Sequence, residues 1–413
     1  MTTLLILGAG REAIPALRRA RTLGYHLVAT DGNAQAPGFA YVDEAIFVST
    51  YAVEETVSYA LEYVRRMGPI HGVIALAADV PQTVAAVAAA LELPGISIET
   101  AHLTSDKFAM KLRFLEAGVP IPWFAAVASA RFPNCEELRT LVAPWDGAPL
   151  VLKPVDSRGA RGVLRLMRDV DLAWAFEYSQ SQSPRGRVML EQWLDGPQIS
   201  TETIVHDGWC ETVGFIDRNY SRLDEFAPHV IEDGGQQPSL LNPAEQQAVR
   251  DVAEQAARAL GITEGIAKGD IVLTPEGPQV IEMAARLSGG YMSSVQVPVA
   301  VGIDVIGIAI KLATGEPVTR HECMASRPHG TAIRYVFSAP GRVCKVQGLD
   351  TVHTLPGVHF VDMPLKVGDA IAATTNHTQR AGCVIAIGMT REEAVVRAER
   401  AVQSIVVATE PIT

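Results

Sequence analysis

Two acidic residues beside one predicted turn are the side chains whose spacing says most about chemistry. An apolar strand ending at Thr274 is joined through Pro275-Glu276-Gly277 to a second strand ending at Glu282. If those three residues form a hairpin loop, Asp270 lies opposite Glu282, with Cβ atoms about 5 Å apart. Two unpaired carboxylates would repel each other there unless they share a cation, and oxygen ligands favour Mg²⁺ or Mn²⁺ over zinc. The alternatives are two solvated acids, or a register slipped by one residue.

Three further segments suit phosphate or nucleotide binding. Lys153 ends an apolar strand, and Asp156–Gly162 is a glycine-rich loop whose backbone N–H groups could contact phosphate oxygens. That loop is no Walker A motif, and by itself it is equally well explained as a polar hairpin loop. Glu191–Pro197 is either a plain connector or a hinge that reads an adenine edge. Arg286 and the glycines after it add a cation and a second loop for close approach. Together these segments favour the metal interpretation of the two acids.

The N-terminal segment contains a separate signal. Gly8-Ala9-Gly10-Arg11-Glu12-Ala13 follows a strand and opens a helix, and Asp31 ends the next strand. This is nearly the dinucleotide fingerprint, in which glycines shape the turn and the acid contacts a ribose. It favours an NAD(P)-dependent oxidoreductase as an alternative function. However, any first strand–helix turn of such a sheet accepts glycines there.

Composition excludes several classes of protein. The chain has 413 residues, a net charge of −11 and 48% hydrophobic residues, which indicates two or three globular domains. The acidic excess argues against a general nucleic-acid or membrane binder, so a polyanion must be held by a few placed cations or a metal. We find no membrane span, no signal peptide and no CxxC spacing among five cysteines. We therefore expect a cytoplasmic protein without disulfide bonds or a zinc site.

The elements that position these residues fall into three regions. Strands and helices alternate over the first hundred residues, which is typical of a parallel, doubly wound α/β sheet. An α+β region follows, with strands at 149–154, 162–167 and 188–190 and helices at 105–118, 171–179 and 242–260. The first of these helices is predicted to present Phe108, Leu112 and Leu115 on one apolar face. A tail region has strands near 330–338 and 383–388 and ends in a helix opened by Thr390.

The order of these motifs resembles the ATP-grasp superfamily of carboxylate–amine ligases, and the tail resembles its L-amino-acid-ligase-like branch. The residues that carry the resemblance are Asp106-Lys107, Val151–Pro154, Gly159–Gly162, Glu191–Gly196, Ile281–Gly290, Lys366–Asp369, Arg380–Gly382 and Gly388–Thr390. The resemblance covers essentially the whole chain. It implies a Rossmann-like pre-ATP-grasp domain at 1–104, an ATP-grasp domain at 105–325 with a lid at about 119–190, and a C-terminal α+β domain at 326–413.

The resemblance also implies how a nucleotide is held. Two lysines would hold the ATP phosphates, the glycine-rich loop would close over them, and Glu191 would meet the adenine amino group. The ribose contact would come from Gln198 or Glu202. The complete set is Lys107, Lys153, Ser157, Arg158, Gly159, Gly162, Glu191, Trp193, Leu194 and Gln198.

The catalytic and metal-binding residues are implied in the same way. Asp270 and Glu282 would bind Mg²⁺, or Mn²⁺. Arg286 would grip the carboxylate substrate or its acyl phosphate, and Lys153 would assist it at the phosphate. Gly290 stands where some dipeptide-forming relatives have a bulky aromatic residue, which leaves the substrate size open.

The function implied is an ATP- and Mg²⁺-dependent ligase. It would activate a carboxylate as an acyl phosphate and join it to an amine, releasing ADP and phosphate. Its partners would be a small-molecule carboxylate and amine, with no nucleic acid or membrane, and relatives are commonly homodimers. The alternatives are the NAD(P)-dependent oxidoreductase and a degenerate ATP-grasp module that binds nucleotide as a sensor.

Overall fold

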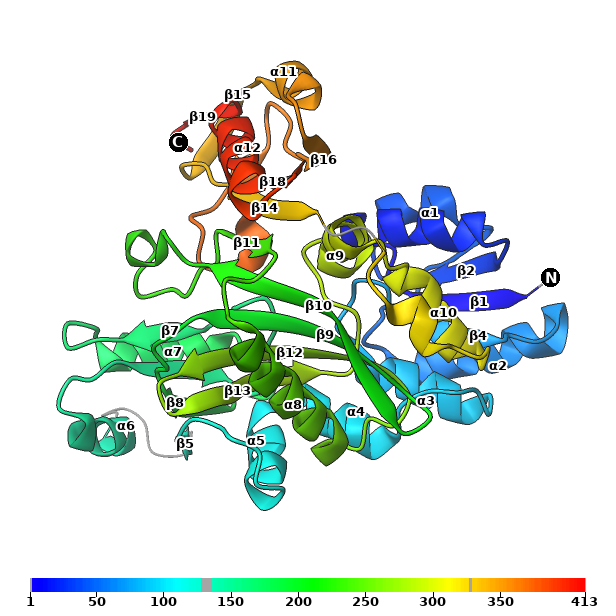
Figure 1. Cartoon of the computed structure of the whole chain (residues 1–413), viewed down its shortest axis with the longest axis horizontal. Helices are drawn as coiled ribbons and strands as arrows, with labels where there is room; N and C mark the ends of the chain where they lie inside the picture. The colour runs from blue at the N-terminus through cyan, green and yellow to red at the C-terminus, as the bar shows by residue number, and fades with distance from the viewer. Residues whose placement is uncertain (1, 128–135, 327–328, 413) are drawn as a thin grey trace.

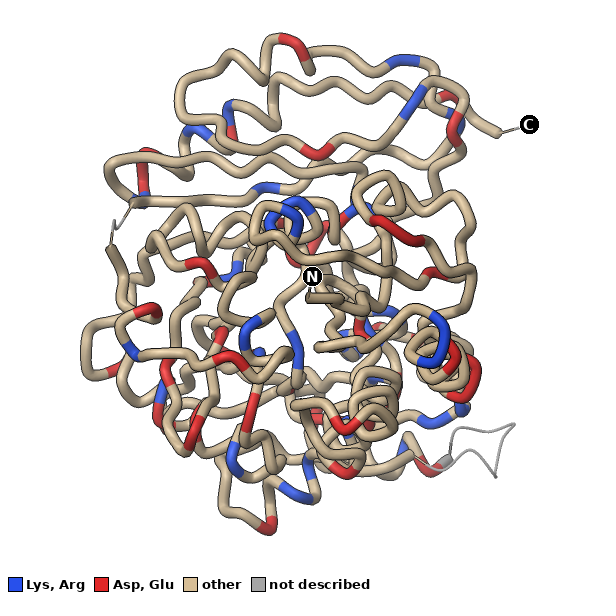
Figure 2. The backbone as a smooth tube through the Cα atoms, turned by 90° about the vertical axis from the view of Figure 1, so that its right-hand side faces the viewer, with Lys and Arg blue, Asp and Glu red and all other residues tan. Residues whose placement is uncertain are grey.

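The computed structural model describes residues 2–127, 136–326 and 329–412. Long central strands, β9 (Gln198–His206) and β10 (Trp209–Asn219), separate three groups of elements. The N-terminal segments (blue) lie to one side, a smaller sheet lies to the other, and the C-terminal segments (red) lie above (Figure 1). Basic and acidic residues are interspersed along the backbone in Figure 2, and neither sign covers the whole view.

The N-terminal region is a parallel sheet with helices, as the alternation predicts. Its strands are β1 (Thr3–Leu7), β2 (His26–Thr30), β3 (Glu44–Ile46) and β4 (Gly72–Ile74), in the order β3-β2-β1-β4. Its helices are α1 (Ile14–Thr22), α2 (Val53–Met67), α3 (Pro81–Ala90) and α4 (Ile98–Ser105). The glycine-rich turn follows β1 at the carboxyl edge of this sheet, where open α/β sheets bind ligands.

A small antiparallel sheet forms the second group. Its order is β5-β8-β6-β7, with β5 (Phe124–Val127), β6 (Leu150–Pro154), β7 (Leu164–Leu166) and β8 (Val188–Gln192). The helices α6 (Glu136–Val142) and α7 (Leu172–Ser181) belong to the same region. The three strands predicted here and the helix at 171–179 are confirmed. The glycine-rich loop at 156–162 joins β6 to β7.

The central antiparallel sheet carries the predicted acidic hairpin. Its order is β13-β12-β9-β10-β11-β14-β18-β16, with β11 (Gly234–Gln237), β12 (Gly265–Thr274), β13 (Gly277–Ala284), β14 (Gly330–Val336), β16 (Val358–Asp362) and β18 (Gly382–Gly388). The predicted helix α8 (Pro243–Ala259) is confirmed, with an Asn242–Glu245 capping box and its apolar face buried. The sequence did not predict β9 and β10, which form the middle of this sheet.

The C-terminal segments extend the central sheet. β14 pairs with β11, so residues on both sides of the expected boundary at 325 and 326 share one sheet. No break in the sheet marks this domain boundary, which stays a prediction from the sequence. The boundary between residues 104 and 105 is likewise a prediction. A second sheet, β17-β15-β19, is built from β15 (Gly341–Gln347), β17 (Ala370–Ile371) and β19 (Val406–Glu410). The tail does not end in α12 (Arg391–Gln403) as predicted, because β19 follows it and pairs with β15.

Helix α5 (Lys107–Glu116) corrects one prediction from the sequence. Of the predicted apolar face, Leu112 and Leu115 are 43% and 63% exposed, and only Phe108 is half-buried, against Phe124. The buried face instead contains Met110, Phe114 and the lysine Lys111. Burial of a lysine is tolerated because carboxylate and carbonyl partners lie within reach of its ammonium group. This helix therefore places lysine ammonium groups in the interior of the protein.

The remaining elements connect the regions. They include α9 (Val297–Val301), α10 (Val305–Thr314) and α11 (Leu349–Thr354). Within the described ranges, no helix is long and apolar enough to cross a bilayer. The cysteines at 210, 323, 344 and 383 are free thiols, whereas Cys135 lies outside the described residues.

Candidate active site

A cavity of about 990 Å³ lies where the regions meet. It is lined by the glycine-rich turn after β1, the loop after β6, the end of β8, the β12–β13 hairpin and residues of the C-terminal region. The ATP-binding, metal-binding and catalytic residues predicted from the sequence all line this cavity, except for one lid glycine, Gly162. The residues singled out from separate motifs are thus brought together in space.

The two acids of the hairpin are paired as predicted, but the loop length and the register that produce this pairing differ from the prediction. Asp270 pairs directly with Glu282, as the sequence predicts. However, Thr274 pairs with Gly277, so the loop has two residues and not the predicted three. A β-bulge between Asp270 and Ile271 supplies the missing residue, which is Ile281 on the other strand. The bulge restores the opposition that the shorter loop would otherwise remove.

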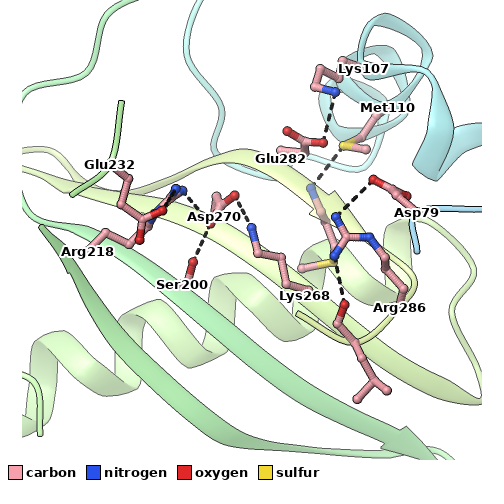
Figure 3. Close-up of polar contacts among 12 residues, drawn as sticks. Asp79, Lys107, Met110, Ser200, Arg218, Glu232, Lys268, Asp270, Glu282 and Arg286 are labelled. Carbon is pink, nitrogen blue, oxygen red and sulfur yellow. Dashed lines mark hydrogen bonds and ion pairs between the residues drawn. The ribbon is translucent and has the colours of Figure 1, made fainter. Parts of the chain in front are cut away.

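The carboxylate of Asp270 is not unpaired, which corrects the expectation from the sequence. Ser200 donates its hydroxyl to Oδ1 at 2.7 Å, and the Arg218 guanidinium lies 3.1 Å from the same oxygen. Lys268 contacts Oδ2 (Figure 3). Burial alone would raise the pKa of Asp270, but Lys268 and Arg218 outweigh it and hold that pKa well below its usual range. The acid is therefore ionised at neutral pH.

Glu282 also has a cationic partner. Its Oε1 lies 3.1 Å from Nζ of Lys107, which also donates to the Ser157 carbonyl oxygen at 2.6 Å. Lys107 thus links the acidic hairpin to the glycine-rich loop. Figure 3 shows Asp270 and Glu282 on the central sheet and Lys107 reaching Glu282 from α5.

The hairpin supplies some, but not all, of the oxygen ligands that a Mg²⁺ or Mn²⁺ ion needs. Asp270 and Glu282 offer carboxylate oxygens from facing positions, which suits Mg²⁺ or Mn²⁺. In the described part of the chain, no group of three or more His, Cys, Asp or Glu side chains could hold a metal ion. Other oxygen ligands would have to come from phosphate groups or water. The site thus suits a metal that arrives with a nucleotide.

A buried cluster connects β6, β8 and α5. The Glu191 carboxylate lies 2.8 Å from Nζ of Lys111 and 2.5 Å from Nζ of Lys153. The three side chains are 3%, 0% and 4% exposed, respectively. Burial would raise the pKa of Glu191, but the two lysines lower it; burial lowers the pKa of Lys111 to about 8. Lys111 belongs to no motif singled out from the sequence, so its place in this cluster was not predicted.

The glycine-rich loop after β6 contacts both other regions. Arg158 donates to the Asp79 carbonyl oxygen at 3.0 Å and lies over the Tyr51 ring. The backbone N–H of His377 donates to the Gly159 carbonyl at 2.9 Å. Gly159 and Gly162 have φ of +62° and +73°, a conformation that glycine adopts without a steric cost. The loop is therefore closed over the cavity.

The end of β8 and the start of β9 form another wall. Trp193 donates its indole N–H to Asp195 at 2.9 Å, and Leu194 and Gln198 line the cavity beside it. Glu202, the other residue suggested for ribose, is fully buried and accepts hydrogen bonds from Ser288 N and Ser293. Burial raises the pKa of Glu202 to about 7. Glu202 does not line the cavity, so only Gln198 remains for that role.

Arg286 contacts the N-terminal region directly. Its guanidinium donates to the Asp79 carboxylate at 3.1 Å and to the Leu287 carbonyl at 2.9 Å (Figure 3). Burial would lower the pKa of Arg286, but Asp79 raises it, so the cation is permanent. The sequence analysis missed Asp79, because nothing local in the chain relates it to a residue more than two hundred positions away.

The C-terminal region supplies residues that the sequence analysis did not assign. Tyr335, His377 and Arg380 line the cavity, and the Arg380 guanidinium stacks 3.6 Å from the Tyr335 ring centroid. A Cβ atom on Gly290 would lie 2.7 Å from the Tyr335 hydroxyl oxygen. The space that a side chain at Gly290 would take is therefore bordered by Tyr335.

The dinucleotide interpretation of the N-terminal loop loses its main support. The Asp31 carboxylate accepts the N–H groups of Ala9 and Asn33, both at 2.9 Å. It therefore fixes its own loop. The loop itself borders the same cavity as the acidic hairpin and the closed glycine-rich loop.

Comparisons with known proteins agree with this arrangement. The chain matches family models described as the ATP-grasp N-terminal domain at residues 17–95, the ATP-grasp domain at 104–290 and the L-amino acid ligase C-terminal domain 2 at 334–410. It is similar to the uncharacterized protein y4rH of Sinorhizobium fredii, with 31% identity over 81% of this chain and 68% of that protein.

Two further comparisons extend over nearly the whole chain. Biotin carboxylase of Pseudomonas aeruginosa is 23% identical over 98% of this chain and 91% of its own length. The crystal structure of an L-amino acid ligase from Bacillus licheniformis superposes with a TM-score of 0.80, at 20% identity and 99% coverage of both chains. That structural likeness concerns the fold.

Proposed function

The chain belongs to the ATP-grasp proteins and has an L-amino acid ligase C-terminal domain, and from this premise we propose that it joins a carboxylate to an amine through an acyl phosphate, releasing ADP and phosphate. The family couples ATP to carboxylate–amine ligation and uses Mg²⁺. A carboxylate is a poor electrophile in water, and phosphorylation converts it into one that an amine can attack. The site must therefore balance the charge of a moving phosphoryl group.

One observation carries the proposal: the Asp270–Glu282 pair shares its cavity with Lys107, Lys153 and Arg286. We propose that the two acids hold Mg²⁺, or Mn²⁺, together with phosphate oxygens. When bound, the ion would neutralise phosphate charge during transfer. The acids are supported for this role by their facing positions and by the permanent ionisation of Asp270.

The nucleotide would lie between the small sheet and the central sheet. We propose that Lys107 and Lys153 contact its phosphates and that Ser157, Arg158, Gly159 and Gly162 cover them. The Glu191 carboxylate is already enclosed by two lysines, which leaves its backbone for the adenine amino group. A set of cavity-lining residues, Trp193, Leu194 and Gln198, would border the adenosine.

Arg286 would hold the carboxylate substrate and then its acyl phosphate. Its fixed charge and its position beside Asp79 support this role. The closed loop at 157–162 would exclude water, which otherwise hydrolyses the acyl phosphate. The substrates would be a small-molecule carboxylate and a small-molecule amine. We further propose a homodimer, which light scattering after size-exclusion chromatography tests.

The test is turnover with defined products. We expect ATP- and Mg²⁺-dependent release of phosphate and ADP with a mixture of carboxylates and amines, and loss of that release in Glu282→Ala. Release of AMP would retain a ligase but overturn the acyl phosphate. Protection by ATP against melting without any turnover would indicate a nucleotide sensor. Protection by NAD and none by ATP would overturn the proposal.

A further inference from the structure

The glycine-rich turn after β1 is the motif that the proposed function has not used. Its backbone is held in place, because Asp31 accepts the Ala9 N–H and a Cβ atom on Gly8 would lie 2.9 Å from Cβ of Ala78. Its last residues, Arg11 and Glu12, line the cavity. The backbone of the turn is therefore fixed where it borders the cavity.

Glu12 makes one direct contact across the cavity wall. Its Oε2 accepts the backbone N–H of Gly290 at 2.9 Å. Gly290 lies four residues after Arg286, and a Cβ atom on Gly290 would lie 2.7 Å from the Tyr335 hydroxyl oxygen. The Glu12 carboxylate thus borders the loop that follows Arg286, and both residues line the same cavity.

Glu12 is an exposed acid at the edge of the cavity. Among the ion pairs formed by the described residues, none involves Glu12, although Arg11 beside it pairs with Asp362 at 2.9 Å. Five other carboxylates that line the cavity have cationic partners: Asp79, Glu191, Glu232, Asp270 and Glu282. The two that have none, Asp31 and Asp195, accept hydrogen bonds within their own loops, from the Ala9 N–H and the Trp193 indole N–H. Glu12 differs from these two because its one hydrogen bond is to the loop that follows Arg286.

We propose that Glu12 binds the ammonium group of the amine substrate and accepts its proton, which rests on the ligase function proposed above. The substrate class is a primary amine that is protonated in water, such as the α-amino group of an amino acid. An ammonium ion has no lone pair and cannot attack a carbonyl. A carboxylate without a cationic partner both attracts the ion and takes its proton.

The step balances as follows. One N–H proton moves to the Glu12 carboxylate, and the freed lone pair forms the C–N bond at the acyl phosphate carbon. The bond from that carbon to the phosphoryl oxygen then breaks, and its electron pair leaves with phosphate. A second proton from nitrogen goes to the departing phosphate, which leaves a neutral amide.

A purely structural role for Glu12 makes a different prediction. The contact with Gly290 N requires only an acceptor oxygen, and the amide oxygen of glutamine provides one of the same length. Glu12→Gln therefore preserves the wall and removes the charge. Glu55→Gln on α2 is the matched control, because Glu55 is an exposed acid outside the cavity.

The experiment compares two nucleophiles with the same enzyme. Wild type, Glu12→Gln and Glu55→Gln are supplied with ATP, Mg²⁺ and a mixture of the standard L-amino acids. One assay measures amide formation, and the other adds hydroxylamine, which is largely uncharged at neutral pH and traps the acyl phosphate as a hydroxamate.

For Glu12→Gln we expect hydroxamate formation within about twofold of wild type and a rate of amide formation from the amino-acid mixture lower by about 100-fold. Equal losses in both assays, or no loss in either, would overturn the role assigned to Glu12. Hydroxamate formed by the wild type would still support the ligase function in that case. Absence of hydroxamate and of phosphate release from wild type would overturn the proposed function and the assignment together.

Discussion

Glu191 and Asp270 each lie between two cations, but their surroundings differ. Glu191 and its two lysines are at most 4% exposed, whereas Asp270, Arg218 and Lys268 are 10–16% exposed beside the cavity. In the closed cluster, each charge is compensated only while the other members are present. In the open cluster, an arriving metal or phosphate can replace a side-chain partner. The same arrangement of charges is thus almost closed to solvent around Glu191, where Lys153 alone is proposed to reach phosphate, and more open around Asp270.

The largest effect is expected from the closed cluster. Glu191→Gln leaves two buried lysines without a carboxylate, so we expect the free energy of unfolding to fall by about 3–5 kcal/mol. Denaturant titration followed by circular dichroism measures it, with Glu55→Gln expected within about 0.5 kcal/mol of wild type. A loss below about 1 kcal/mol would remove the distinction between the two clusters.

In the cluster around Asp270, we expect a substitution to lower the rate of turnover more than the free energy of unfolding. Asp270→Asn retains an acceptor for the Ser200 hydroxyl but loses the charge that balances a cation. We expect ADP release to fall by about 100-fold or more, with a smaller loss of stability than in Glu191→Gln. Unchanged turnover together with an equal loss of stability would make both clusters structural.

A pH series tests the burial of Lys111. Its pKa in the folded state is lowered to about 8 by burial, from about 10.5 in the unfolded chain. Between these values the unfolded chain binds more protons at this site, so stability gains with rising pH. We expect the stability of wild type to rise relative to Lys111→Met by about 1.4 kcal/mol per pH unit in that window. Parallel stability curves for the two proteins contradict this.

The smallest effect concerns the hydroxyl that orients Asp270. Ser200→Ala removes one hydrogen bond to Oδ1 and leaves both cations in place. We expect a loss of about 1 kcal/mol in the free energy of unfolding and turnover within about tenfold of wild type. A loss of turnover as large as that of Asp270→Asn would show that orientation matters as much as charge.

Local patterns predicted the acidic hairpin and α8 well. The pairing of Asp270 with Glu282 was predicted although the loop length was wrong, because the bulge at Ile281 offsets the residue that the shorter loop removes. The capping residues of α8 marked its start directly. Such features depend on neighbours within a few residues and can be read from the chain.

Features that depend on distant neighbours were missed or mistaken. The buried lysine of α5 contradicts ordinary amphipathic periodicity, since its compensation by Glu191 and the Val280 carbonyl comes from other strands. Tyr335 and Arg380 enter the cavity because β14 and β18 extend the central sheet, which strand-by-strand patterns do not specify. The site residues that were not predicted are therefore those whose positions depend on contacts between segments far apart in the sequence.

The bulge at Ile281 has a consequence for how this hairpin can change in evolution. Successive residues of a strand point to opposite faces, so one inserted or deleted residue turns every later side chain over. Ile281 is the exception, because it is the extra residue of the bulge: deleting it alone would straighten the ladder and leave Asp270 opposite Glu282 with the same two-residue loop. The bulge thus allows this hairpin to lose one residue beside Glu282 without separating the two acids. We therefore expect homologues with one residue fewer here to lack the bulge and to retain both acids.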